Sequence, residues 1–129
     1  MRTPGATIDV VFAADRAYVP HLATAVTSLM ETNRSLVARV WVITNSSTST
    51  RFLRFQRDIY ERYQLRPVFL EVDENRFSAM DVSGHVSWAT YARFLLGELL
   101  PHDVDTVLYL DSDLVVVGSL DELYSRLTP

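Results

Sequence analysis

The chain has 129 residues, 48% hydrophobic and 22% charged, which is ordinary for one globular domain that buries a core of its own. The net charge of −4 argues against nucleic acid as a partner, and no apolar run is long enough to span a membrane. The absence of cysteine excludes disulfides and thiolate metal sites and permits a cytoplasmic location, and the absence of lysine excludes every mechanism that needs one. We therefore expect a single cytoplasmic domain over residues 1–129.

Short apolar runs alternate with amphipathic stretches along the chain. The runs that are rich in β-branched and aromatic residues predict strands at 8–14, 38–44, 67–72 and 106–110. Apolar residues at helical spacing predict helices at 21–31, 52–63 and 88–99, and a further element begins near 120. Strands that alternate with helices in this way predict an α/β domain with a largely parallel sheet.

Two acids interrupt the last apolar run, VLYLDSDLVVV. In an extended chain residues i and i+2 point the same way, so Asp111 and Asp113 project together while Ser112 turns aside. Two carboxylates held this close repel each other unless a cation lies between them. Mg²⁺ or Mn²⁺, shared with substrate phosphates, suits such oxygen ligands. The alternative is a strand end followed by an Asx-turn, with both acids solvated.

Polar and aromatic residues also follow the first predicted strand. Parallel sheets bind ligands beyond the carboxyl ends of their strands, so Asp15, Tyr18 and Asp111 are expected at one crevice. Asp15 could accept a hydrogen bond from an imide or a ribose hydroxyl, and Tyr18 could stack on a base. The alternatives are a helix N-cap and a half-buried core tyrosine. No Gly-rich phosphate loop follows the strand, which argues against a dinucleotide-binding unit or a P-loop.

Two further residues precede the fourth strand. Arg93, on the helix leading to that strand, could face the crevice and bind a hydroxyl or phosphate, although a solvated arginine on the helix surface fits the pattern equally well. His85 lies in the loop before this helix, where a lone histidine is more often a surface residue than a ligand or base.

Three segments in order resemble retaining glycosyltransferase family eight, which includes lipopolysaccharide galactosyl- and glucosyltransferases and the glycogenins. These segments are IDVVFAADRAYVPHLATAVTSL, HVSWATYARFLLGELL and TVLYLDSDLVV. The resemblance covers nearly the whole chain. It implies a GT-A fold, which is a Rossmann-like nucleotide-sugar-binding domain, a UDP-linked sugar donor, and Mn²⁺ (or Mg²⁺) as the metal.

The resemblance also implies a role for each matching residue. Asp111 and Asp113 match the Asp-x-Asp pair that binds the metal and, through it, the donor diphosphate. The remaining matches are the backbone of Ser112 near the ribose, Ala13 and Asp15 at the uracil, Tyr18 stacked on the base, Arg93 at the donor sugar and phosphates, and His85 on the acceptor side.

Two departures from the family pattern stand out. Ala17 replaces an asparagine found in the bacterial galactosyltransferase, which puts one polar contact to the nucleotide in doubt. The chain also ends at Pro129, whereas the family's third metal ligand, a histidine, and the residues around the transferred sugar and the acceptor come later. We therefore expect a C-terminally truncated GT-A domain, either a fragment of a longer enzyme or a truncated product.

The function expected from the resemblance is metal-dependent transfer of a hexose, with retention, from a UDP-sugar to a glycan, a lipid-linked sugar or a protein. The alternative is a non-catalytic nucleotide-binding module, or a fragment that needs a partner or the missing C-terminal half. A haloacid-dehalogenase-type phosphatase is disfavoured because Leu114 and Val115, not Gly-Thr, follow the acids and no lysine is present. The apolar run 114–117, with Leu120, Leu123 and Leu127, has little to pack against within the chain, which predicts self-association through the C-terminal region.

Overall fold

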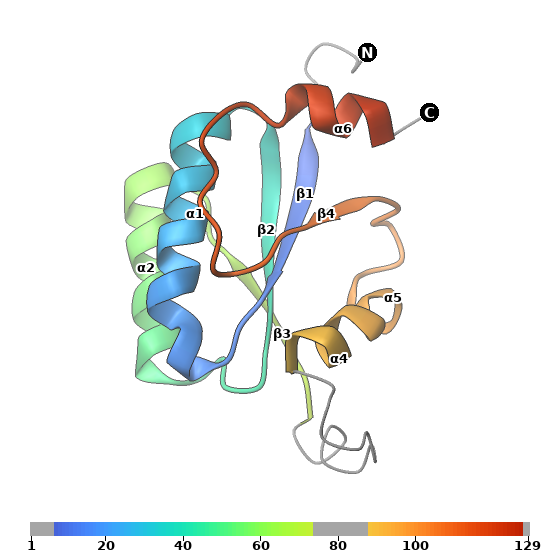
Figure 1. The fold of residues 1–129 in the computed structure, drawn as a ribbon. Helices are drawn as coiled ribbons and strands as arrows, with labels where there is room; N and C mark the ends of the chain where they lie inside the picture. Colours follow the sequence, from blue (N-terminus) through green and yellow to red (C-terminus); the bar gives the residue numbers. More distant parts are fainter. Residues whose placement is uncertain (1–6, 74–87, 128–129) are drawn as a thin grey trace.

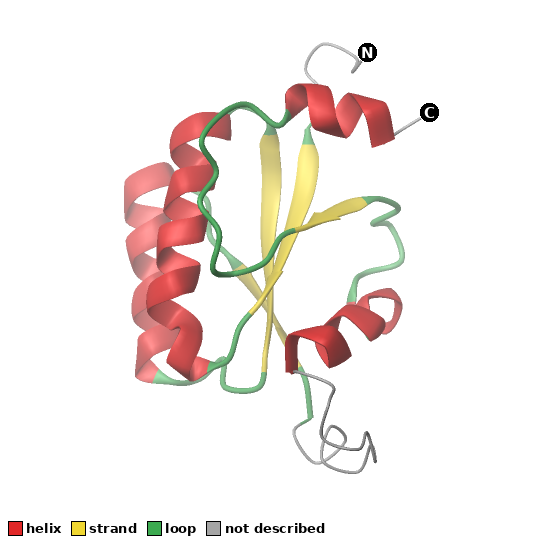
Figure 2. Ribbon diagram, viewed as in Figure 1, coloured by secondary structure: helices red, strands yellow, loops and turns green. Residues whose placement is uncertain are grey.

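A computed structural model describes residues 7–73 and 88–127. Within these ranges one sheet has the strand order β3-β2-β1-β4, and all three pairings are parallel (Figures 1 and 2). The strands are β1 (Ile8–Ala13), β2 (Val37–Thr44), β3 (Val68–Glu71) and β4 (Val107–Tyr109). The helices are the 3₁₀-helix η1 (Arg16–Tyr18), α1 (Val19–Asn33), α2 (Thr50–Tyr63), α4 (Trp88–Phe94), α5 (Leu96–Leu99) and α6 (Asp121–Leu127).

The sheet has a helical layer on each face. Helices α1 and α2 cover one face, and α4 and α5 cover the other (Figure 1). Alternate residues of β1 enter two different cores: Val10 and Phe12 pack with α1 and α2, whereas Val11 and Ala13 pack with α4. Because β1 is central and covered on both sides, all six of its residues are buried, and five of them are apolar. The sixth, Asp9, is paired with Arg39 of β2 (2.7 Å).

The predicted α/β class and parallel sheet are confirmed, and each strand bound lies within one residue of its prediction. The single helix expected at 88–99 is wrong, because it breaks at Leu95 into α4 and α5. The amide of Leu95 donates to the carbonyl of Ala92 (3.1 Å), three residues back, and the amide of Glu98 donates to that of Leu95 (2.9 Å). These tighter turns end one helix and start another. None of the helices in the described ranges has the length and apolarity to cross a membrane.

The segment after the acid pair differs from the expectation of an uncovered apolar run. Val116 is buried in the core beside α1, and Leu114 and Leu120 pack partly against the same core. Val115 and Val117 point away, with 59% and 89% of their surface exposed. The expectation is therefore wrong for Leu114 and Val116: along this segment, side chains that pack against the core alternate with exposed ones.

Candidate functional site

The carboxyl ends of β1 and β4 lie side by side. Val11 is paired with Tyr109 in the parallel ladder, and the amide of Leu110 donates to the carbonyl of Val11 (2.9 Å). The residues that follow the two strands therefore leave the sheet at the same edge, which we call the carboxyl edge. The predicted convergence of Asp15 and Asp111 on this edge follows from that pairing.

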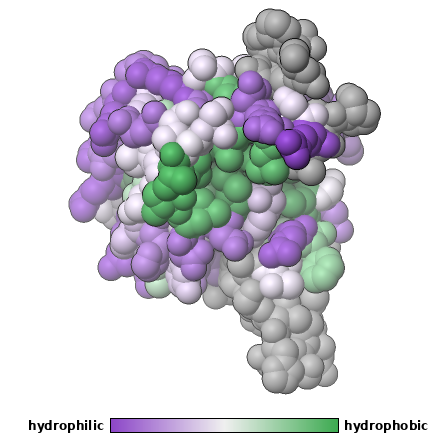
Figure 3. Space-filling view, turned by 45° about the horizontal axis from the view of Figure 1, so that its top comes forward, coloured by the Kyte–Doolittle hydropathy of each residue, from purple (hydrophilic) through white to green (hydrophobic). Residues whose placement is uncertain are grey.

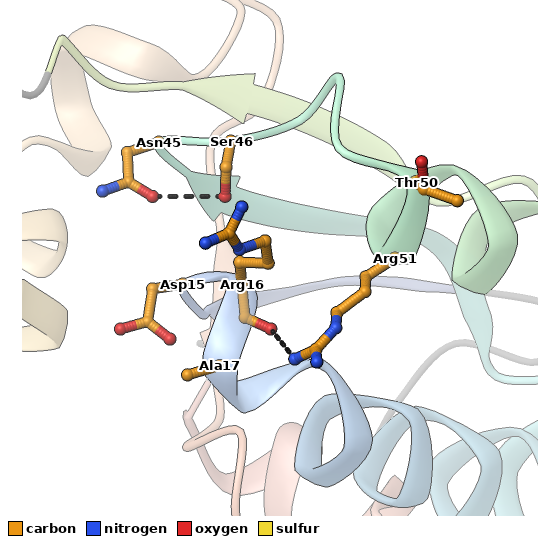
Figure 4. A pocket seen from close by; sticks show the side chains of 7 residues that line it. All are labelled: Asp15, Arg16, Ala17, Asn45, Ser46, Thr50 and Arg51. Carbon is orange, nitrogen blue, oxygen red and sulfur yellow. Dashed lines mark hydrogen bonds between the residues drawn. The ribbon is translucent and has the colours of Figure 1, made fainter.

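A cleft of about 760 Å³ opens at the carboxyl edge between η1 and the loop that follows β2 (Figure 4). Its lining residues are Asp15, Arg16, Ala17, Asn45, Ser46, Thr50 and Arg51. The Arg51 side chain donates to the Arg16 carbonyl (3.5 Å), which ties the start of α2 to η1. The cleft thus offers two guanidinium groups, one carboxylate, two hydroxyls and one side-chain amide, a set that suits a polar ligand with hydrogen-bond acceptors.

Asp15 has a structural role at the mouth of the cleft. It is the N-cap of η1, and its Oδ1 accepts from the Tyr18 amide (3.1 Å). The N-cap alternative is thus realised, and it uses one of the two carboxylate oxygens. Tyr18 is not a core residue: 47% of its surface is exposed, and its ring centroid lies 5.4 Å from that of His21. The exposed ring is available to a ligand.

The acid pair follows β4. Asp111 and Asp113 are exposed, whereas Ser112 between them is buried. Within the described part of the chain, neither carboxylate has a hydrogen bond or ion pair, and no cluster of three or more His, Cys, Asp or Glu side chains is placed to hold a metal. Two carboxylates fit a divalent cation that takes its other ligands from water and phosphate, as Mg²⁺ does. The pair does not form a complete metal cage.

Arg93 contacts Tyr109, the last residue of β4, which precedes Asp111 by two residues. Its guanidinium carbon is 5.1 Å from the centroid of the Tyr109 ring, although the arginine itself is exposed. Burial raises the pKa of the Tyr109 hydroxyl, the positive charge of Arg93 and its hydrogen bond partly oppose that rise, and Asp111 adds to it. Asp111 and Arg93 thus both act on one tyrosine. The alternative of a solvated surface arginine is only partly correct: Arg93 is exposed, but its guanidinium group lies over the ring of Tyr109, the last residue of β4.

The structure brings most of the predicted residues to one edge. Ala13, Asp15 and Tyr18 come from the end of β1, Asp111, Ser112 and Asp113 from the end of β4, and Arg93 from α4. His85 lies outside the described residues. Sequence reasoning missed the far wall of the cleft, which consists of Asn45, Ser46, Thr50 and Arg51. The sequence feature that could have revealed this wall is the polar loop directly after the second strand, because the carboxyl ends of parallel strands lie at the same edge of the sheet.

The fold and the site together define a Rossmann-like α/β domain that is open to a polar ligand beyond the carboxyl ends of its strands. Residues 9–126 match the protein family described as glycosyl transferase family 8, and the chain belongs to that family.

The chain is similar to several curated glycosyltransferases. It is 30% identical over 116 residues to the glycosyltransferase GlyF of Streptococcus pneumoniae, covering 90% of this chain and 28% of GlyF. It is 24% identical over 115 residues to the lipopolysaccharide 1,3-galactosyltransferase of Salmonella typhimurium, covering 89% of this chain and 34% of the relative. The chain therefore spans about a third of the length of these relatives.

A solved structure shows the same fold. The galactosyltransferase LgtC, in complex with donor and acceptor sugar analogs, superposes with a TM-score of 0.74 at 30% identity. The match covers 91% of this chain and 42% of LgtC. The predicted GT-A fold is thereby confirmed for the part of the fold that this chain contains.

Proposed function

We propose that this chain is the nucleotide-sugar-binding part of a metal-dependent glycosyltransferase that transfers a hexose from a UDP-sugar, with retention, to an acceptor. One observation supports this function above the others. In a chain of glycosyl transferase family 8, the acid pair after β4 leaves the sheet at the same edge as Asp15 and Tyr18 after β1. A nucleoside diphosphate has a flat base that can stack on an aromatic ring, and a diphosphate whose negative charge a cation bound by two carboxylates can neutralise.

The residues after β1 would bind the uridine. Tyr18 presents an exposed ring for stacking on the base. Asp15 keeps a second carboxylate oxygen, beyond the one that caps η1, to accept from the uracil imide. Ala13, buried at the end of β1, would place its main chain against the edge of the base. Arg16 and Arg51 would compensate for the polar contact that Ala17 does not supply, since both line the same cleft.

The residues after β4 would bind the diphosphate. Asp111 and Asp113 would hold Mn²⁺ or Mg²⁺, with the buried Ser112 fixing the turn between them. The bound cation would act as a Lewis acid that neutralises charge on the leaving diphosphate. Arg93, held over Tyr109, would place its guanidinium on phosphate or sugar oxygens. The acceptor is a glycan, a lipid-linked sugar or a protein in this proposal, with His85 on the acceptor side.

Calorimetric titration of UDP into the 129-residue chain tests the proposal. We expect binding with Mn²⁺ or Mg²⁺ present and a loss of binding in EDTA, because two uncompensated carboxylates would repel the diphosphate. The double variant Asp111→Asn/Asp113→Asn should lose the metal-dependent binding and keep its fold. Equal UDP affinity with and without EDTA would rule out the metal role.

The chain contains a matched control. Asp103 and Asp105 form a second pair with the same spacing, exposed on the loop that precedes β4, at the opposite end of the strand. The double variant Asp103→Asn/Asp105→Asn changes net charge by the same amount and should bind UDP as the wild type does. Binding without turnover of any UDP-hexose would favour the alternative of a nucleotide-binding module. The cytoplasmic location expected from composition stays a prediction.

A further inference from the structure

The segment that leaves the acid pair is attached to α1 by side chains. After Asp113 the chain runs beside α1 before it reaches α6 (Figure 1). The Ser28 Oγ accepts from the Val116 amide (2.8 Å). The Asn33 side chain makes two further bonds: its Nδ2 donates to the Gly118 carbonyl (3.0 Å), and its Oδ1 accepts from the Leu120 amide (2.7 Å).

Both side chains are arranged for this attachment. Asn33 is 4% exposed and lies on the apolar face of α1, where an amide is costly unless it is fully hydrogen-bonded. Its remaining amide hydrogen is directed to the Thr32 Oγ1 (2.8 Å). The Ser28 hydroxyl donates to the Ala25 carbonyl (2.7 Å), which leaves its lone pairs for the Val116 amide. The buried Asn33 amide thus depends on the segment for two of its hydrogen bonds, and the Ser28 hydroxyl accepts a third bond from it.

The two acids are held unequally by the sheet. Asp111 directly follows Leu110, whose amide is bonded to β1. Asp113 lies beyond that bond. In the described part of the chain, the next hydrogen bonds that join the segment to another element are those to Ser28 and Asn33. Val116 is buried in the core that includes the apolar face of α1, so the attachment has a packed side chain as well as polar bonds.

We propose that Ser28 and Asn33 are positioning residues for the acid pair: by fixing residues 116–120 to α1, they hold the Asp113 carboxylate beside that of Asp111. The proposal rests on the cation-binding role proposed above. A carboxylate on an unattached segment samples many positions. A cation that binds both acids would have to restrict that motion, and the lost conformational entropy would weaken binding. Prior attachment removes that cost, as outer-shell partners do for other metal ligands.

The test uses the 129-residue chain and measures Mn²⁺ binding by electron paramagnetic resonance in the presence of UDP. Ser28→Ala and Asn33→Ala should each raise the Mn²⁺ dissociation constant by about tenfold or more. Uridine, which lacks the diphosphate, should bind both variants within about twofold of the wild type. Hydrogen exchange at the Val116 and Leu120 amides should become faster.

Two controls separate positioning from general weakening of the domain. Thr24→Ala removes an exposed hydroxyl that donates to the Pro20 carbonyl (3.1 Å) within α1, and it should leave Mn²⁺ binding unchanged. Ile59→Val weakens the buried face of α2 without touching the segment, and it should lower stability without a comparable loss of Mn²⁺ affinity.

Three results would overturn the proposal. The first is wild-type Mn²⁺ affinity in both positioning variants, whether or not hydrogen exchange shows the segment released. The second is an equal loss of uridine and Mn²⁺ binding that Ile59→Val reproduces, because the bonds would then be only structural. The third is a wild-type chain that binds no Mn²⁺ with UDP. That result removes the proposed function as well, and it is distinguishable because it appears before any variant is made.

Discussion

At the scale of single residues, Asp15 and Tyr18 combine a local structural hydrogen bond with an exposed side chain. The bond from the Tyr18 amide to Asp15 Oδ1 fixes the turn that leaves β1. The tyrosine side chain stands outside the core, next to His21. A residue whose backbone is held and whose ring is free is well placed to stack on a flat ligand without first becoming ordered.

Tyr18→Ala should weaken UDP binding by about 1–3 kcal/mol, the usual range for loss of one base-stacking aromatic. The melting temperature should change little, because the ring contributes little to the core. Titration calorimetry and thermal unfolding measure the two effects. His21→Ala removes the neighbouring exposed ring and should leave UDP affinity closer to that of the wild type. A variant that melts much lower but binds normally once folded would show that Tyr18 is a packing residue.

At the scale of elements, the sequence predicts what local patterns determine. The strands are found because short apolar, β-branched runs are buried on both faces of a parallel sheet, as β1 is. The break at Leu95 was missed because apolar spacing does not report a change from four-residue to three-residue turns. The path after Asp113 was missed because its partners on α1 lie 85 to 88 residues away in the chain. Asn33 lies two residues beyond the helix predicted at 21–31, so no predicted element marked it as a partner of that path.

In the candidate site too, features set by local sequence were predictable, and features set by packing between distant elements were not. Strand ends in a parallel sheet meet at one edge, so Asp15, Asp111 and Asp113 could be placed from the sequence. The contact of Arg93 with Tyr109 and the cleft wall formed by Arg51 could not, because each depends on how a helix packs on the sheet.

Tyr63 connects α2 to α1 and provides a test of this packing by pH. Its hydroxyl donates to the Glu31 Oε2 (2.7 Å). Burial, followed by this hydrogen bond, raises the pKa of Tyr63 above its ordinary value, although Arg62 and Arg34 act in the opposite direction. Below about pH 10 the tyrosine is protonated in both the folded and the unfolded chain, so its contribution to stability is constant. Above that pH the unfolded chain releases the proton more readily, and the free energy of unfolding should fall.

Urea unfolding at pH 8 and near pH 11 should therefore show a smaller decrease in stability for Tyr63→Phe than for the wild type. Tyr60→Phe removes the same hydroxyl from a position on α2 that is 42% exposed, and it serves as the control for tyrosine content. An unchanged decrease in Tyr63→Phe would mean that the hydroxyl titrates equally in both states.

At the scale of the whole molecule, apolar surface gathers where the chain leaves β4. Figure 3 shows a hydrophobic patch on the face crossed by the segment between β4 and α6, with hydrophilic residues around it. Val115 and Val117 are exposed there, and Leu123 on α6 is 46% exposed. Strand β4 is also an edge of the sheet in the described part of the chain. Large apolar patches and unpaired strand edges both favour association with another surface.

We predict that the 129-residue chain self-associates through this region at micromolar concentration, even though Val116 and Leu120 fold back onto α1. The double variant Val115→Ser/Val117→Ser should shift sedimentation velocity profiles toward the monomer, because it removes exposed apolar surface and leaves the buried residues in place. Leu53→Ser, which changes a 50% exposed leucine on α2 at a different surface, should not do so. A wild-type chain that stays monomeric, with its Val115 and Val117 amides protected from hydrogen exchange, would contradict self-association through this region.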